Sequence, residues 1–247
     1  MPLLVAYEVL ALAYKKGLGD RNHTLILENI GNVNPAPLPT KEYANYNQTF
    51  ALLVLNASII EGTVRSILSE LIYNDYDSQA KIEVQAGRSE PSKPQQLLQK
   101  FRYEVEVQGG WEKLKEQFSF YFDLSIDSTL SEDTKEAINT LFVLRNVLAH
   151  GTALVHPNTP MDASMKAEYP YNWQRKLQQA RVYLEKHFGH TDIFDNLAEF
   201  AVPEHFLKIS KQFFSELSTA FGDFPERAAK TVLTLHNYEF GFVSLSR

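Results

Sequence analysis

The sequence predicts a mainly α-helical protein: a bundle of long antiparallel helices with a small β-sheet formed by the N- and C-terminal segments. Three observations support this fold class. Apolar residues alternate spacings of three and four over residues 41–74, which marks one side of a long helix. Residues 132–150 carry helix-start residues at one end and a glycine after the other. Alternating apolar residues close to the C-terminus favour a strand.

The composition limits the classes of protein that fit. A chain of 247 residues, 44% apolar, can bury a sizeable core in one large domain or one domain with an appendage. The net charge of −6 is not typical of a nucleic-acid-binding protein, so any RNA contact must use local basic patches. The absence of cysteine excludes disulfides and fits a reducing cytoplasm, where we expect the protein.

The N-terminal segment contains two short apolar runs. Residues 3–14 fit either a short helix or a strand. They lack a basic start, include Glu8 and are too short for a membrane span, so we expect neither a signal peptide nor a membrane anchor. His23–Ile30 predicts a strand, and Asn32–Thr40, which holds three prolines, predicts a linker.

The central part of the chain predicts helices separated by a loop. Lys41–Asn74 predicts one long helix, with Glu61 beside its apolar side. Residues 75–93 predict a loop, and two helices are expected at Pro94–Val107 and Trp111–Phe122. The apolar side of the long helix consists of Phe50, Leu53, Ala57, Ile60, Val64, Ile67 and Leu71.

The remaining segments follow the predicted helix 132–150. Thr152–Tyr171 predicts a long loop, and Asn172–His190 and Pro203–Phe221 predict helices. In the tail, Thr231–Arg247, the alternation in YEFGFVSLS predicts a strand, which we expect to pair with residues 24–30. The expected division is residues 1–40 as N-terminal segment and linker, 41–221 as the helical domain and 222–247 as a C-terminal extension.

The segment LFVLRNVLAHG brings three polar residues together at the end of an apolar helix. Arg145, Asn146 and His150 lie within six residues, and Gly151 is the expected helix stop. The start is expected at Thr129 with Glu132 as a capping box, or at Ser131. Ala137, Leu141, Leu144 and Leu148 share one face, which Arg145 flanks, while Asn146 and His150 are one turn apart on the opposite side.

Cations at the end of a helix also have a purely structural interpretation. They complement the helix dipole, and a histidine before glycine often binds a carbonyl. The spacing from arginine to histidine is itself common, since it recurs from Arg181 to His187. The Arg145 copy differs by its context, with asparagine beside the arginine and glycine after the histidine.

The chemistry of these residue types suits RNA cleavage without a metal. Histidine has a pKa near neutrality and can take the proton from a 2′-OH or give a proton to the leaving oxygen. Arginine presents a fork of donors that matches phosphate oxygens. Asn146 could orient the imidazole of His150 or bind phosphate directly.

The segment LRNVLAHG resembles the defining motif of the HEPN superfamily, a group of all-helical domains. The long HEPN helix with an acidic residue at its centre is resembled by residues 51–68, ALLVLNASIIEGTVRSIL. The family's helix between that long helix and the motif is resembled by residues 109–122, GGWEKLKEQFSFYF. The resemblance covers residues 41–221. One toxin subgroup has a tyrosine where this chain has Thr152, which argues against that subgroup only.

The resemblance implies a HEPN-like bundle and a function. Many HEPN proteins resemble metal-independent endoribonucleases of toxin–antitoxin, phage-defence and RNA-processing systems. Their motifs face each other across a homodimer, which implies a homodimer here and allows for an antitoxin or other regulatory protein. The catalytic residues implied are Arg145, Asn146 and His150, with Glu61 orienting one of them. The structural alternative for Glu61 is an ion pair with Arg65, four residues later.

The helix Asn172–His190 is the most basic stretch of this acidic chain, and Trp173 and Tyr183 offer stacking faces, although a solvated helix face is the other interpretation. The expected RNA-binding residues are Arg175, Lys176, Arg181 and Lys186. His187 and His190 come with no third ligand placed by spacing, so we expect no metal and no cofactor.

Two classes of function therefore compete. The first is a metal-independent endoribonuclease of HEPN type, acting as a toxin or phage-defence effector. The second is a catalytically inactive HEPN-fold module for binding or dimerisation. The joint presence of Arg145, Asn146 and His150 favours the first, because inactive HEPN proteins often lose one of the three.

Overall fold

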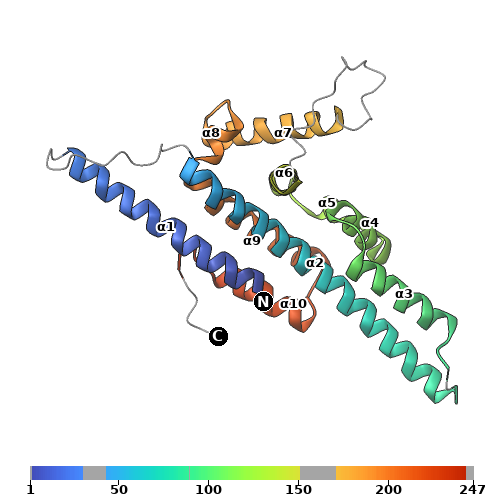
Figure 1. The fold of residues 1–247 in the computed structure, drawn as a ribbon. Helices are drawn as coiled ribbons and strands as arrows, with labels where there is room; N and C mark the ends of the chain where they lie inside the picture. Colours follow the sequence, from blue (N-terminus) through green and yellow to red (C-terminus); the bar gives the residue numbers. More distant parts are fainter. Residues whose placement is uncertain (1, 30–42, 89, 151–170, 243–247) are drawn as a thin grey trace. The chain divides into compact units, whose positions relative to one another are not determined.

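A computed structural model describes residues 2–29, 43–88, 90–150 and 171–242 (Figure 1). Within these ranges the chain forms helices and no strand, so the mainly α-helical class is confirmed and the expected sheet is not found. In chain order the helices are α1 (Pro2–Asn29), α2 (Tyr43–Gln85), α3 (Lys93–Val107), α4 (Trp111–Phe122), α5 (Ile126–Thr129), α6 (Glu132–His150), α7 (Tyr171–Phe188), α8 (Ile193–Leu197), α9 (Ala201–Phe221) and α10 (Glu226–Asn237).

The chain divides into two compact units. Unit 1 consists of Met1–Ser58, Glu132–Gln212 and Asn237–Arg247, and unit 2 consists of Ile59–Ser131 and Phe213–His236. Helices α2 and α9, and α10 by its last residue, contribute residues to both units. The motif helix α6 belongs to unit 1.

Unit 1 is held together by polar contacts between helices that are distant in sequence. The Tyr7 hydroxyl on α1 donates to the carbonyl of Pro203 on α9 at 3.4 Å. The Ser210 hydroxyl on α9 donates to Asn56 Oδ1 on α2 at 2.8 Å. Because all four residues are buried, these bonds satisfy groups that would be costly to leave unpaired. They tie α1, α2 and α9 to one another.

The tail after α10 packs on α1 as an irregular segment. The Tyr7 ring meets the rings of Tyr238 and Phe240 edge to face, at 6.1 and 6.5 Å between centroids. Lys15 Nζ donates to the Phe240 carbonyl at 3.0 Å. Gly241 has a φ of +82°, a left-handed conformation that ends any extended strand. The strand expected in YEFGFVSLS is therefore wrong over residues 238–242, and residues 243–247 lie outside the described chain.

The strand expected at His23–Ile30 is also wrong, because α1 continues through Asn29. The run TLIL is a short apolar segment, and periodicity alone does not separate a strand from a buried turn of helix in such a run. The helix also passes through Gly17 and Gly19, since a glycine costs a helix only about 1 kcal/mol. For residues 3–14, the helical alternative is the correct one.

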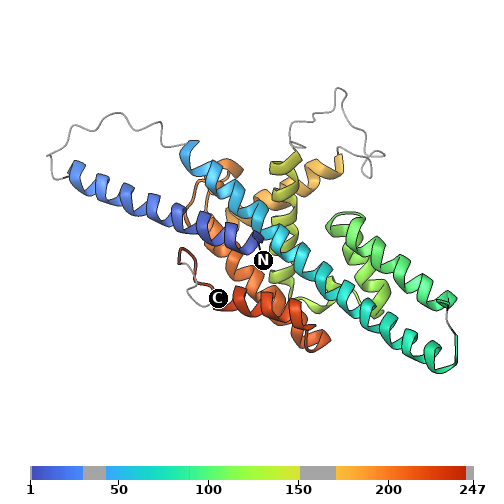
Figure 2. The same ribbon diagram turned by 60° about the horizontal axis from the view of Figure 1, so that its bottom comes forward.

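Unit 2 is held together by aromatic packing and by a hydrogen bond between helices. Phe118 contacts Phe122 and Phe221, with ring centroids 4.4 and 4.9 Å away. Helix α3 runs beside the part of α2 that belongs to unit 2 (Figure 2). On that side the Ser69 hydroxyl of α2 donates to Glu106 of α3 at 2.6 Å. The aromatic packing thus joins α4 to the end of α9, and the hydrogen bond joins α2 to α3.

The loop expected at residues 75–93 is much shorter in the structure. Helix α2 continues to Gln85 and only a brief connection precedes α3. Polar pairs one turn apart support this extension: Lys81 pairs with Asp77 at 2.6 Å, and Gln79 donates to Glu83 at 3.1 Å. The extension is polar, so it lacks the apolar periodicity from which the sequence predicts a helix.

Several expected boundaries are confirmed. The helices expected at Pro94–Val107, Trp111–Phe122 and Glu132–His150 correspond to α3, α4 and α6. Ser131 directly precedes α6, whereas the Thr129 hydroxyl donates to the Ile126 carbonyl inside α5, so the capping box expected there is wrong. The expected linker 32–40, the loop at 152–170 and the helix stop Gly151 lie outside the described residues.

Among the described residues, one helical stretch, Gln48–Gln85 of α2, is long and apolar enough to cross a membrane by length and composition alone. More than half of its most apolar window is buried inside the protein, as in the core helix of a globular protein. This stretch is therefore weak evidence for a membrane span.

Candidate functional site

The motif helix α6 buries one apolar face. Ala137, Leu141 and Leu144 are buried, as the sequence predicts, and Leu148 is half-buried. This face fixes the rotation of the helix about its axis. The polar residues of the motif are consequently held at known positions around α6.

Arg145 and Asn146 form a side-chain pair near the C-terminal end of α6. Arg145 Nη1 donates to Asn146 Oδ1 at 2.8 Å, and both residues are half-buried. Arginine only donates, so the amide oxygen must face the guanidinium and the amide NH₂ faces away from it. Arg145 starts on the flank of the apolar face, and this bond draws its guanidinium toward the side of Asn146.

His150 is the last residue of α6 and follows Asn146 by four residues, one helical turn. Its side chain lies outside the described part of the chain. The backbone of α6 therefore places position 150 on the same side as Asn146, as expected. The negative end of a helix dipole favours a protonated imidazole at such a position.

Glu61 belongs to unit 2, where it pairs with Arg65 at 3.0 Å. Arg65 also donates to the carbonyls of Val105, Gln108 and Gly109. These carbonyls end helix α3 and lack partners within it, so Arg65 caps α3 and ties it to α2. The structural alternative for Glu61 is thus present, and its catalytic role stays a prediction.

The four basic residues expected to bind RNA have different surroundings on α7. Arg175 is exposed, and Lys176 lines a groove described below. Arg181 Nη1 donates to the Thr191 carbonyl at 3.4 Å, and Lys186 Nζ lies 3.8 Å from Glu136 of α6. Arg181 is thereby engaged with the connection to α8.

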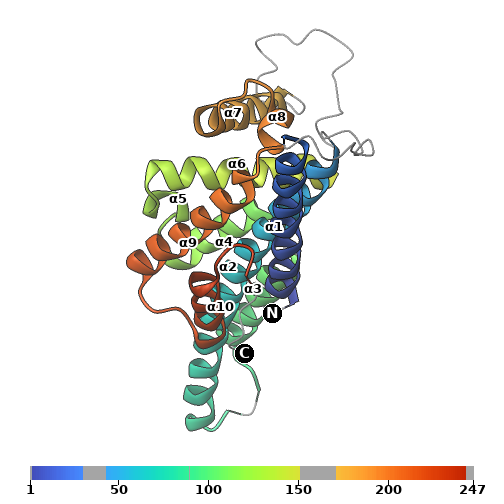
Figure 3. The ribbon, with the colours of Figure 1, turned by 90° about the vertical axis from the view of Figure 1, so that its left-hand side faces the viewer.

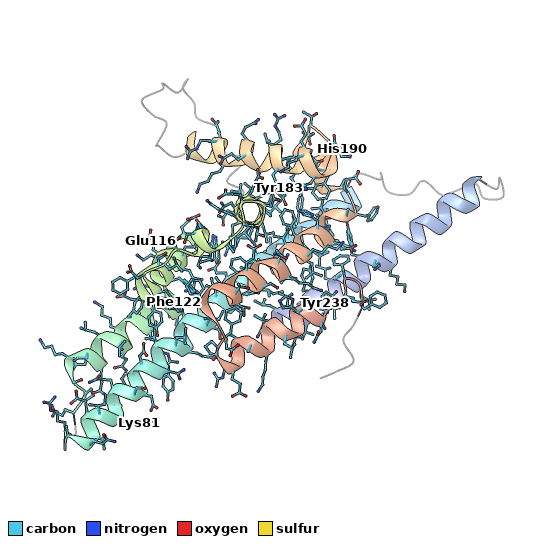
Figure 4. All side chains as sticks on the ribbon, turned by 180° about the vertical axis from the view of Figure 1, so that it is seen from behind. Lys81, Glu116, Phe122, Tyr183, His190 and Tyr238 are labelled. Carbon is cyan, nitrogen blue, oxygen red and sulfur yellow. The ribbon has the colours of Figure 1, made fainter. Side chains whose placement is uncertain are left out.

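The stacking role expected for Tyr183 is wrong. Its side chain is only 2% exposed and forms part of the core of unit 1 (Figure 4). A base cannot stack on a ring that the protein already covers. The side chain of Trp173 lies outside the described residues.

Helices α6 and α7 lie side by side and pack against each other (Figure 3). Their side chains line a groove of about 480 Å³. Most of the side chains that line it are polar or charged, unlike the predominantly apolar side chains of pockets typical of drug-sized ligands. From α6 come Glu132, Asp133, Lys135, Glu136, Asn139, Thr140 and Val143, and from α7 Lys176, Gln178, Gln179, Ala180 and Val182. Sequence reasoning missed this groove because it depends on which two helices pack together.

A cluster of two histidines and a tyrosine connects α7, which also lines the groove, to α9. The Tyr183 hydroxyl and His205 Nε2 are 2.6 Å apart, and the His187 and His205 rings are 5.0 Å apart. Burial lowers the pKa of His205 from 6.5 to about 4, and the nearby positive charges of His187 and Lys208 contribute to this decrease. Burial also raises the pKa of Tyr183, and Glu136 and Asp133 raise it further, so their negative field reaches α7.

This cluster is another feature that sequence reasoning missed. His187 follows Tyr183 by one turn, but His205 is on a different helix and nothing local in the sequence relates it to them. Because its pKa is low, His205 is neutral at neutral pH. We therefore assign the cluster a packing role.

His190 and the connection from α7 to α8 form a separate polar network. His190 Nε2 lies 2.8 Å from Glu199 Oε1, and Asn196 Nδ2 donates to the His190 carbonyl at 2.6 Å. Asp192 caps α8 by accepting from the backbone N–H of Phe194 at 2.7 Å. In the described ranges, no three His, Cys, Asp or Glu side chains gather in a group that could hold a metal ion.

Comparison with known proteins adds no assignment. No protein-family model, no curated protein and no solved structure matches this chain.

Proposed function

We propose that this protein is a metal-independent endoribonuclease of the HEPN type, acting as a toxin or phage-defence effector. The observation that carries the proposal is the Arg145–Asn146 pair one turn before His150 at the end of α6. The three residue types and their spacing resemble the HEPN motif, and the described helix has the boundaries that this motif expects. HEPN architecture, homodimer and regulatory partner are part of the same proposal.

In the proposed reaction the 2′-oxygen attacks the adjacent phosphorus and the bond from phosphorus to the 5′-oxygen breaks. Arg145 neutralises the charge that develops on the phosphate oxygens. His150, protonated at the negative end of α6, gives its proton to the leaving 5′-oxygen. The 2′-OH proton passes to a base, for which the second His150 of a dimer is the proposed group. The products are a 2′,3′-cyclic phosphate and a 5′-OH end.

The proposal is tested by RNA cleavage with EDTA present, comparing wild type with Arg145→Ala and His150→Ala. We expect the wild type to cleave and each variant to lose at least about 100-fold in rate, the usual contribution of a general acid or charge-stabilising group. Arg88→Ala and His190→Ala are matched controls at positions outside the motif, and we expect both to cleave as the wild type does. Equal background in all five proteins would support the inactive binding module instead.

A further inference from the structure

The groove between α6 and α7 lies on the same side of α6 as Asn146 and position 150. At 100° per residue, Glu132, Glu136, Asn139 and Val143 fall within about 60° of one another around the helix. Continuing this spacing toward the C-terminus gives Asn146 and position 150. One line of α6 therefore runs from the groove to the motif.

The charges and polar groups in the groove discriminate between parts of an RNA. Carboxylates at one end, Glu132, Asp133 and Glu136, repel phosphate and accept hydrogen bonds. Lysines 135 and 176 and the amides of Asn139, Gln178 and Gln179 can donate. A ligand that fits must present adjacent donors on one edge and acceptors on another.

Guanine has this arrangement. Its N1–H and N2 amino group are adjacent donors for a carboxylate, and its O6 and N7 accept from lysine, the commonest pairing to this base. Adenine, cytosine and uracil have no two adjacent donors on the Watson–Crick edge. In each of them an acceptor stands beside the donor, and a carboxylate that takes the donor meets that acceptor unfavourably. In a duplex the donor edge of guanine is already paired, so the base must be unpaired.

We propose that the α6–α7 groove binds an unpaired guanine of the substrate RNA. This inference rests on the proposed ribonuclease function and names its substrate class: single-stranded RNA containing guanine. Glu136 and His150 are 14 residues apart, about 21 Å along α6 at 1.5 Å per residue. The guanine in the groove is therefore several nucleotides from the cleaved bond, and cleavage occurs at a fixed offset from it.

The carboxylates of the groove already form ion pairs with lysines, but these pairs do not prevent the binding of a base. Glu136 pairs with Lys186 at 3.8 Å, with both side chains about half exposed. Glu132 pairs with Lys135 at 3.5 Å and is 89% exposed. Exposed pairs of this kind contribute little to stability, so the carboxylates can exchange a lysine for a base edge at small cost.

The test measures binding separately from cleavage. Short 2′-O-methyl oligoribonucleotides lack the attacking hydroxyl and cannot be cut, so wild-type protein can be titrated by fluorescence anisotropy. One ligand carries a single guanine in an A/U sequence, and the other carries inosine there, which lacks only the N2 amino group. We expect the guanine ligand to bind roughly tenfold more tightly, the effect of one base-edge contact.

Glu136→Gln should reduce this guanine preference to within about twofold, because a neutral amide replaces an acceptor-only carboxylate. Glu226→Gln, an 81% exposed glutamate on α10, is the matched control and should keep the full preference. Equal wild-type affinity for the two ligands, no binding of either, or an unchanged preference in Glu136→Gln would overturn the inference.

The outcomes also separate this inference from the proposed function. Cleavage of unmodified RNA at sites unrelated to guanine would remove the groove assignment and leave the ribonuclease intact. Guanine-selective binding without any cleavage would leave the groove as a binding site and remove the ribonuclease.

Discussion

At the scale of single residues, pairing decides which charged groups serve the fold and which belong to the candidate site. Arg65 donates to three carbonyls at the end of α3 and to Glu61, so its charge is committed to the fold of unit 2. Arg145, by contrast, is joined to a neighbouring amide on its own helix. In the proposed function the Arg145 guanidinium binds phosphate, whereas that of Arg65 serves the fold.

His205 supplies a pH dependence at the same scale. Its pKa is about 4 in the folded protein, against 6.5 for an ordinary histidine, so between these values the unfolded chain binds a proton that the folded protein does not. Stability should therefore fall as the pH drops from about 6.5 to about 4. Thermal unfolding across this range should show a smaller drop for His205→Gln, which cannot titrate, than for wild type.

Leu233→Gln, at a 61% exposed position on α10, is the control for this measurement, because it introduces and removes no titratable group. It should retain the wild-type pH dependence. An identical drop in stability for wild type and His205→Gln would show that the half-buried imidazole near Tyr183 is not its source.

At the scale of elements, the sequence predicts what local periodicity encodes. The boundaries of α4 and α6 follow from an apolar face together with glycines or capping residues at the ends. The extension of α2 through residues 75–85 escapes prediction because pairs such as Lys81–Asp77 support it without an apolar face. The tail around Tyr238 and Phe240 contacts α1, but contact across more than 200 residues does not determine whether the segments are strands.

The extension of α2 can be tested with a proline. Ser78 is exposed and lies inside α2, about two turns before its C-terminal end, so Ser78→Pro should cost roughly 3 kcal/mol by removing a backbone hydrogen bond and clashing with the preceding turn. Ser78→Ala, which suits a helix, should be neutral or slightly stabilising. Urea unfolding measures both, and a harmless proline would instead agree with the loop that the sequence alone predicts.

At the scale of the whole molecule, the sequence predicts one part of the candidate site and does not predict the other. Arg145, Asn146 and His150 can be found from their spacing on one helix. The groove cannot be found from the sequence, because Gln179 and Glu136 are brought together by the packing of α7 on α6. Comparable tertiary information is needed for the cluster of Tyr183 and His205.

The proposed homodimer is also tested at this scale. Val147 and Leu148 stay half-buried at the end of α6, and in the proposal a second subunit covers them. Sedimentation equilibrium should give twice the chain mass of 28.2 kDa. Val147→Asp should weaken the dimer and cleavage together, whereas Leu233→Asp, at a 61% exposed site on α10, should affect neither. A wild-type monomer at all concentrations would contradict the dimer.

The most direct test of the central claim is the identity of the RNA ends that the purified protein produces in EDTA. The account predicts 2′,3′-cyclic phosphate and 5′-OH ends from wild type, and neither from Arg145→Ala or His150→Ala. Cleavage that persists in both variants, or wild-type protein that is a folded dimer and leaves RNA intact, would contradict it.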